Sequence, residues 1–253
     1  MHARLRGLVL AALALTASAE PLVAAEIKVL TAGAMRGVLE ALLPEFEKTT
    51  GHKVTLDNAT AGTLAKRIAG GEAFDLAIIT PAVIDEATRG GKIDPPRVDL
   101  AKVGMGVAIK EGAPVPDIST VEAFKQALLA AKSVAYIDPK AGGSSGIYFD
   151  GLIDRLGIGA EVRAKARLKA GGYVADLVAS GEAELAVHQI SEILPVKGAR
   201  LVGPLPAPVQ NATVYSAGLS AAAKDPAAAK ALLDHLIGPS AGAVLNAKGM
   251  EKP

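Results

Sequence analysis

The sequence predicts an α/β protein made of two lobes, and three observations support this fold class. Short apolar, β-branched runs alternate with helical stripes whose apolar residues recur about every 3.6 positions. Between residues 26 and 89 this alternation reads β-α-β-α-β-α, the pattern of a parallel sheet covered by helices on both faces. After Gly90-Gly91 and Asp94-Pro95-Pro96, an apolar strand at 103–110 leads into a second alternating series. We therefore expect two α/β lobes joined by crossing strands.

The first lobe should contain three parallel strands, at 26–30, 53–57 and 75–80. The last of them (DLAIIT) is a near-continuous apolar run, as buried parallel strands are. The helix after the first strand has one apolar face, made of Val38, Leu39, Leu42, Leu43 and Phe46. Gly51 ends this helix, a shorter helix is expected at 63–69, and Pro81 suits a first helical position.

The second lobe should repeat the alternation. We expect strands at 133–137 and 185–188, and helices at 121–131, 147–156 and 173–180. A strand at 214–219 would return to the first lobe, and helices at 227–236 and 240–248 would close the chain. The expected division is lobe 1 at 26–103 and 214–253 and lobe 2 at 104–213, with crossings near 103–110 and 205–216.

The N-terminus has the features of a secretory signal peptide. Arg4 and Arg6 precede an uncharged Leu- and Ala-rich run at 7–17, and small residues follow. The apolar run is shorter than the roughly 20 residues that span a bilayer. We expect export to the periplasm and cleavage after Ala25.

Composition excludes several classes of function. The chain has no cysteine, so no disulfide forms, and the formal net charge of +1 gives no basic excess for nucleic acid. With no cysteine and no paired histidine spacing, neither a metal site nor a cofactor is expected. Aromatic residues make up only 3% and tryptophan is absent, which favours a small polar or anionic ligand over a sugar or peptide.

Several segments, taken in order, resemble a known family. They are AGAMRGVLEALLPEFEKTTGHKV, NATAGTLAKRIAGGEAFDLAIIT, GGSSGIYFDGLIDRLGI, SGEAELAVHQISEIL and DPAAAKALLDHLIGPSAGAVLNAKGM. This order resembles the type II periplasmic binding proteins of the molybdate-binding branch, from about Glu26 to Met250. The resemblance implies two Rossmann-like lobes, a two-strand hinge, a small anion held between the lobes and the membrane permease of an ABC importer as partner. We expect a monomer.

The chain departs from this family at its expected ligand site. The family's first-loop serine is missing, because Thr31 is the only hydroxyl there and Arg36 follows it. The second-loop serine position corresponds to Thr60, and a tyrosine of the second lobe corresponds to Gln189. Since an arginine forms two-pronged pairs with carboxylates, a small carboxylate is favoured over molybdate.

Candidate site residues cluster where strands end and helices begin, at 32–36, 58–63 and 142–146. Unpaired backbone N–H groups and the helix dipole favour anions there, although the same serines and threonines also serve as helix caps. The candidate ligand-binding residues are Gly33, Ala34, Met35, Arg36, Asn58, Thr60, Thr63, Thr80, Ser144, Ser145, Gly146, Tyr148, His188 and Gln189.

Two functions from different classes remain open. The leading hypothesis is a transport receptor that closes around an anion, and a sensory role for the same receptor is not separated from it. The alternative is an isomerase interconverting trans- and cis-aconitate, as some proteins resembling this family are. That reaction needs a carboxylate clamp, for which Arg36 with the Ser144-Ser145 loop is the candidate. It also needs a base that reaches an allylic carbon acid, for which His188 is the candidate. The distinguishing feature is whether both residues face the cleft.

Overall fold

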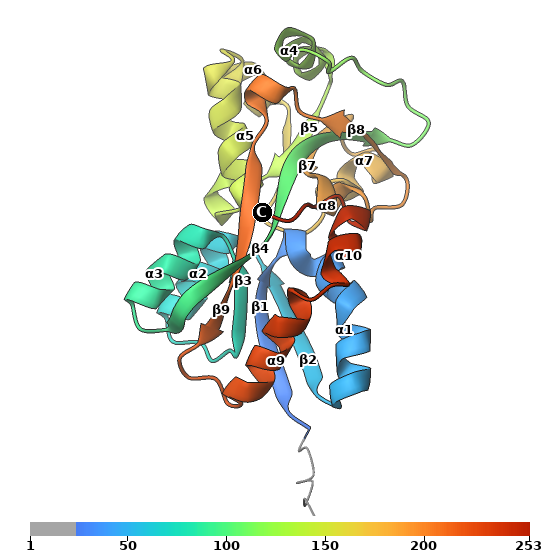
Figure 1. The fold of residues 1–253 in the computed structure, drawn as a ribbon. Coiled ribbons are helices and arrows are strands. Elements are labelled where there is room, and N and C mark those ends of the chain that lie inside the picture. Colours follow the sequence, from blue (N-terminus) through green and yellow to red (C-terminus); the bar gives the residue numbers. More distant parts are fainter. Residues whose placement is uncertain (1–23) are drawn as a thin grey trace, which may run out of the picture.

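The computed structural model describes residues 24–253 and shows two lobes stacked end to end and bridged by long strands (Figure 1). Residues 1–23 of the expected signal peptide lie outside the described part. No helix within 24–253 is both long and apolar enough to cross a bilayer.

Lobe 1 is built on a mixed sheet whose strand order is β2-β1-β3-β9-β4. The strands β1 (Glu26–Ala32), β2 (Lys53–Ala59) and β3 (Leu76–Ile79) are parallel. The strand β9 (Ala212–Ser220) runs antiparallel to β3 and to β4 (Ile93–Lys110). The three parallel strands lie where the alternating pattern predicts them.

Helices cover both faces of this sheet, and each face has its own apolar core. One face packs against α1 (Arg36–Thr50), α9 (Pro226–Leu236) and α10 (Ala241–Ala247). The other packs against α2 (Ala61–Ala69) and α3 (Pro81–Arg89). The short 3₁₀ helix η1 (Gly33–Met35) joins β1 to α1.

Lobe 2 is smaller and follows the order β4-β7-β5-β6, with β8 also pairing to β4. Its strands are β5 (Val134–Ile137), β6 (Ala166–Lys169), β7 (Leu185–Gln189) and β8 (Ala199–Pro204). Its helices are α4 (Val121–Ala130), η2 (Pro139–Ala141), α5 (Ser144–Arg155), α6 (Gly159–Ala164), α7 (Asp176–Ser180), α8 (Ile190–Ile193) and η3 (Ala207–Val209). They bury two further apolar cores, one on each face of the sheet.

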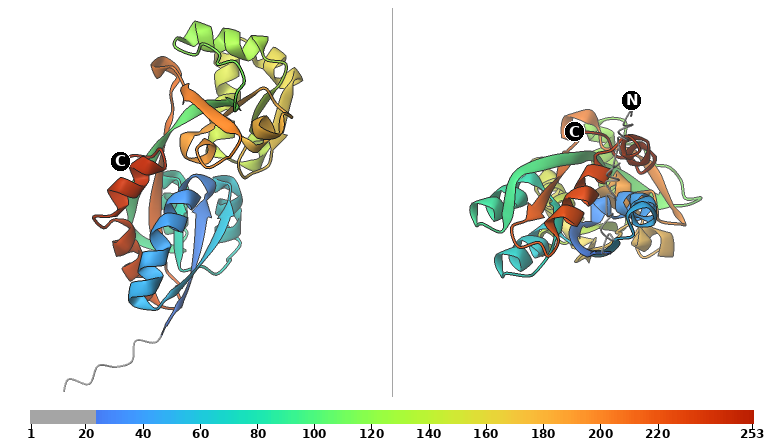
Figure 2. Two further views of the ribbon diagram at one scale, coloured as in Figure 1. Left: turned by 90° about the vertical axis from the view of Figure 1, so that its right-hand side faces the viewer. Right: turned by 60° about the horizontal axis from the view of Figure 1, so that its bottom comes forward.

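The strand β4 passes from one lobe to the other. It pairs with β9 up to Gly104, and beyond that point with β7 from Met105 to Ala108 and with β8 from Gly106 to Lys110. The strand begins at Ile93, ten residues before the strand expected at 103–110. The sequence did not predict this first part, because its prolines and exposed charged residues hide the strand pattern. The change of partner at Gly104 and Met105 is the point we propose as the first hinge crossing. The turned view in Figure 2 shows the two segments that cross between the lobes, in β4 and at the start of β9, on one side of the molecule.

Candidate functional site

A cavity of about 350 Å³ lies between the lobes. This volume falls within the range of small-molecule sites. Lobe 1 lines it with Ala32, Gly33, Arg36, Asn58, Ala59, Thr60, Ala61 and Tyr215. Lobe 2 lines it with Ile137, Gly143, Ser144, Ser145, Lys169, Gly171, Gly172, Tyr173, Asp176, His188, Gln189 and Glu192.

Topology brings these residues together. The strands β1, β2, β5 and β7 all end at the cavity, and the next short or long helix begins there. In open α/β sheets this edge is where ligands bind. The start of α5 therefore directs backbone N–H groups toward the space between the lobes, whereas Gly62 N and Thr63 N at the start of α2 already donate to Gly142 O and Thr60 Oγ1.

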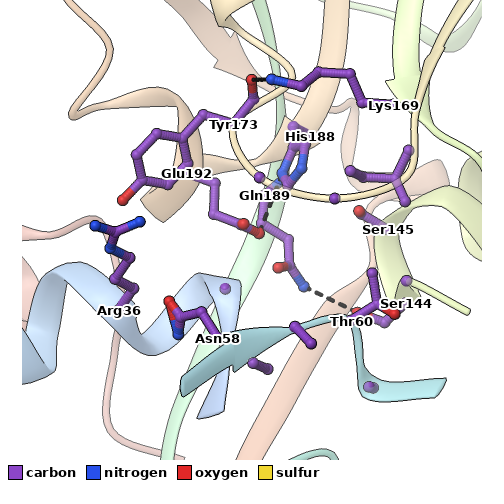
Figure 3. A pocket seen from close by; sticks show the side chains of 18 of the residues that line it. Arg36, Asn58, Thr60, Ser144, Ser145, Lys169, Tyr173, His188, Gln189 and Glu192 are labelled. Atoms are coloured by element: carbon purple, nitrogen blue, oxygen red, sulfur yellow. Dashed lines mark hydrogen bonds and ion pairs between the residues drawn. The ribbon is translucent and has the colours of Figure 1, made fainter. Parts of the chain in front are cut away.

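Arg36 lies at one end of the cavity. Its Nε donates to Glu40 Oε1 at 2.7 Å, one turn further along α1, and this pairing raises the pKa of the guanidinium. The salt bridge uses Nε only, so the two Nη groups remain for a ligand. Figure 3 shows the guanidinium beside the hydroxyl of Tyr173, which comes from the opposite lobe.

Ser144 lies at the other end, next to a polar bridge between the lobes. Gln189 Nε2 donates to Tyr215 Oη at 2.7 Å, and Tyr215 Oη lies 2.9 Å from Gln189 Oε1. Gln189 Nε2 also lies 3.3 Å from Ser144 Oγ. Burial raises the pKa of Tyr215, so the phenol is neutral and acts as donor or acceptor without charge.

His188 and Glu192 form a buried pair between these two ends. They are 1% and 6% exposed, and His188 Nδ1 lies 3.3 Å from Glu192 Oε2. Burial lowers the pKa of His188 to about 3 and raises the pKa of Glu192 to about 8. Near neutral pH the pair is therefore an uncharged imidazole beside an uncharged carboxylic acid, not an ion pair.

The hydrogen bonds indicate where the protons are. The backbone N–H of Gln189 donates to His188 Nδ1 at 2.8 Å, so Nδ1 carries a lone pair and Nε2 carries the ring proton. The Glu192 hydroxyl can share the same lone pair. Within the described residues His188 Nε2 has no hydrogen-bond partner.

The two lobes touch around the cavity, so this is a closed form. Gly62 N donates to Gly142 O at 3.0 Å, and Thr60 Oγ1 donates to Ala141 O at 2.5 Å. A Cβ added to Gly62 would lie 2.9 Å from the Cα of Gly142. The lobes can approach this closely because both residues at the contact are glycines.

Eight of the fourteen residues predicted from the sequence line the cavity. They are Gly33, Arg36, Asn58, Thr60, Ser144, Ser145, His188 and Gln189.

The other six predicted residues do not line the cavity and make structural contacts elsewhere. Ala34 and Met35 are buried in the core of lobe 1, and Gly146 packs against the backbone of Ile137. Thr80 stands at the N-cap position of α3. Thr63 bonds to Thr60 on the first turn of α2, and Tyr148 donates to the carbonyl of Val209.

Sequence reasoning missed Lys169, Asp176, Glu192 and Tyr215 as lining residues. A usable indication existed for Glu192, because it stands four residues after His188, where a strand gives way to a helix. Lys169 donates to Tyr173 O and to Asp176, so it fixes the loop at 170–176 that forms one wall. No group of three or more potential metal ligands comes together within residues 24–253.

The family profile described as "Bacterial extracellular solute-binding protein" matches residues 27–251. The chain belongs to this family. Among solved structures, the periplasmic molybdate-binding protein of Azotobacter vinelandii superimposes with a TM-score of 0.76, at 22% identity, over 90% of this chain and 99% of that one. The chain is thus a solute-binding protein of the type II periplasmic fold, which confirms the two-lobed α/β prediction.

Two curated relatives have different activities. An aconitate isomerase from a Pseudomonas species is 34% identical over 99% of this chain and 98% of its own length. The molybdate-binding protein ModA of A. vinelandii is 28% identical over 89% of this chain and 90% of its own. The relatives of this chain therefore include both a protein named as a binding protein and one named as an enzyme.

Proposed function

We propose that this protein captures a small carboxylate anion by closing its two lobes around it. The observation that carries the proposal is the pair of anion-attracting ends in one cavity. Arg36 offers its Nη groups at one end, and the start of α5 with Ser144 and Ser145 is at the other. A cleft with two such ends suits a ligand bearing more than one anionic group.

The arginine favours a carboxylate over a tetrahedral oxyanion. A guanidinium matches the planar geometry of a carboxylate through two parallel hydrogen bonds. Molybdate needs only hydroxyl and N–H donors around a compact ion, and the cavity contains a guanidinium, an imidazole and a carboxylic acid in addition. The cavity is therefore lined by more charged and titratable groups than a compact oxyanion requires.

Family membership supports a role outside the cytoplasm. As a receptor, the protein would act in the periplasm as a monomer after removal of residues 1–25, and deliver its ligand to the permease of an ABC importer. Closure would be the event that such a permease recognises, because it alters the relative position of the two lobes.

Thermal unfolding tests the ligand class, because a ligand that binds only the folded protein raises its melting temperature. We expect citrate, cis-aconitate and trans-aconitate to raise it, and sulfate, phosphate, molybdate and tungstate to leave it unchanged. Arg36→Gln should abolish the shift, whereas Arg89→Gln, at the exposed end of α3, should retain it. Stabilisation by molybdate or tungstate alone would contradict the proposal.

A second function, isomerisation of aconitate, is favoured by two specific observations. Arg36 and His188, the two residues on which it was expected to depend, line the same cavity. The relative that is 34% identical over nearly the full length of both chains is an aconitate isomerase. Incubation with trans-aconitate and separation of the two isomers by chromatography tests it directly, and absence of cis-aconitate after prolonged incubation excludes it.

A further inference from the structure

Glu192 is a buried carboxyl group without a cationic partner. It lines the cavity and is 6% exposed, and its one ion-pair neighbour within the described residues is the neutral His188. Buried carboxyls are usually paired with a cation or bonded by several donors. No cation pairs with Glu192 within residues 24–253, so its place in the cavity lining points to the ligand.

The position of Glu192 depends on closure of the lobes. It projects from α8 of lobe 2 toward η1 of lobe 1, where a Cβ on Gly33 would come within 2.5 Å of Glu192 Oε1. Figure 3 shows its carboxyl group in the middle of the cavity, with Arg36 on one side and the Ser144 and Ser145 loop on the other. A ligand held at both ends would therefore present its central carbons to Glu192.

His188 is less suited to act on the ligand than Glu192. Its Nδ1 accepts the backbone N–H of Gln189 and faces Glu192 Oε2, and its Nε2 already carries the ring proton. The only nitrogen with a lone pair is thus directed at Glu192 and at the backbone, not at the open cavity. This arrangement makes His188 a positioning residue that holds the Glu192 carboxyl.

We propose that Glu192 is the acid–base residue of this cleft, exchanging a proton with the carbon skeleton of an unsaturated polycarboxylate. The inference rests on the second candidate function, isomerisation. It replaces His188, the base expected from the sequence, by its neighbour four residues further on.

The proposed step is an allylic proton shift. The Glu192 carboxylate removes a hydrogen, as a proton, from the CH₂ group next to the double bond. The C–H electron pair spreads over the allylic carbons and their carboxylates. Glu192 then returns the proton to the far carbon of the former double bond, so the double bond moves by one position. No oxidant, reductant or second substrate is consumed.

The environment of Glu192 sets its protonation. The titratable groups that line the cavity around it are Arg36, Lys169, Tyr173, Asp176, His188 and Tyr215. Burial raises the pKa of Glu192 to about 8, so roughly a tenth of the molecules carry the basic carboxylate at pH 7. Catalytic acids and bases work best with a pKa near the working pH.

Deuterium exchange tests the assignment without requiring net isomerisation. The mature protein is incubated with trans-aconitate in D₂O, and the loss of the CH₂ proton signal is followed by NMR. Binding of trans-aconitate is measured in parallel by calorimetry. We expect wild-type exchange, at least a 100-fold slower exchange in Glu192→Gln, and a dissociation constant within a few-fold of wild type, since acid–base catalysis contributes roughly 10²- to 10⁴-fold. Glu86→Gln, on the exposed side of α3, is the matched control and should exchange at the wild-type rate.

Several other results would contradict the assignment of Glu192. Exchange by Glu192→Gln at the wild-type rate, or a wild-type protein that binds with neither exchange nor conversion of trans- to cis-aconitate, overturns the assignment and leaves carboxylate capture standing. Absence of binding by the wild type overturns both. If Glu192→Gln fails to fold by circular dichroism, the pH dependence of the wild-type exchange rate decides. The rate should rise with pH, reach half its maximum near pH 8 and level off above it, and His188→Asn should shift that midpoint. A flat pH profile contradicts the proposal.

Discussion

At the scale of single residues, Glu192 and His188 make the stability of the fold depend on pH in opposite directions. Between about pH 3 and 6.5, unfolding takes up a proton at His188, so stability rises with pH. Between about pH 4.5 and 8, unfolding releases the proton of Glu192, so stability falls as pH rises. The two effects oppose each other where the windows overlap, and the loss caused by Glu192 dominates from about pH 6.5 to 8.

Replacing Glu192 by glutamine should remove only the loss of stability that Glu192 causes as the pH rises. Relative to wild type, Glu192→Gln should gain about 1.4 kcal/mol of unfolding free energy for each pH unit between pH 4.5 and 8. Urea denaturation at pH 5, 6.5 and 8 measures this difference, with Glu86→Gln as the variant expected to follow the wild-type curve. Parallel curves for Glu192→Gln and wild type would show that Glu192 is ionised in the folded protein.

The residue scale also shows how far the sequence could predict the site. Residues at strand ends, such as Arg36, Thr60 and Ser144, were predicted because glycines, hydroxyls and helix starts mark them. Tyr215 carries no such mark, because a tyrosine in a strand has many structural explanations, and the one sign of Glu192 is its position four residues after His188. Their role depends on which surfaces meet after closure, and that is a property of the tertiary structure.

At the scale of elements, the start of α2 links helix capping to lobe closure. Thr60 accepts from Thr63 N as the N-cap of α2 and also donates to Ala141 O across the cleft. Gly62, two residues on, touches Gly142 of the other lobe. The first turn of α2 thus both caps its own helix and makes the contact with lobe 2 that closes the cavity.

A methyl group at Gly62 should therefore oppose closure. Gly62→Ala should weaken ligand binding by tenfold or more, while helix propensity alone would stabilise α2 by up to about 1 kcal/mol. Gly37→Ala is the matched control, since Gly37 is likewise the second residue of a helix but its Cβ would meet only the Lys248 side chain, at 3.8 Å. Calorimetric titration with the ligand found by thermal unfolding measures both. Equal affinity in the two variants would mean that the contact of Gly62 with Gly142 is not needed for binding.

Prediction of the elements succeeded where burial is greatest. The strands β3 and β7 are buried at every residue, and β1 at five of its seven, because both faces of the sheet are covered. The strands β6 and β8 were missed because neither has a fully buried residue: β6 (ARLK) is half basic, and β8 (ARLVGP) ends in glycine and proline. The first part of β4 was missed because of its prolines and exposed charged residues.

At the scale of the whole molecule, the two lobes have separate apolar cores and are joined by crossing segments on one side. Contacts around Gly62, Tyr215 and Glu192 surround the cavity, and Ile190 of α8 also packs against the apolar core of lobe 1. A ligand that joins both ends of the cavity would add further contacts between the lobes to these. Binding should accordingly shift the population toward closure.

Small-angle X-ray scattering measures this shift directly. The wild-type protein should have a smaller radius of gyration with saturating ligand than without, because closure brings the lobes together about the hinge. Gly62→Ala, at a ligand concentration adjusted to reach the same occupancy, should show a smaller decrease, and Gly37→Ala should match wild type. If the wild-type radius is unchanged at saturation, the cavity fills without lobe movement. The receptor mechanism would then lose its closure step, because a permease would have no difference in shape by which to distinguish the loaded protein.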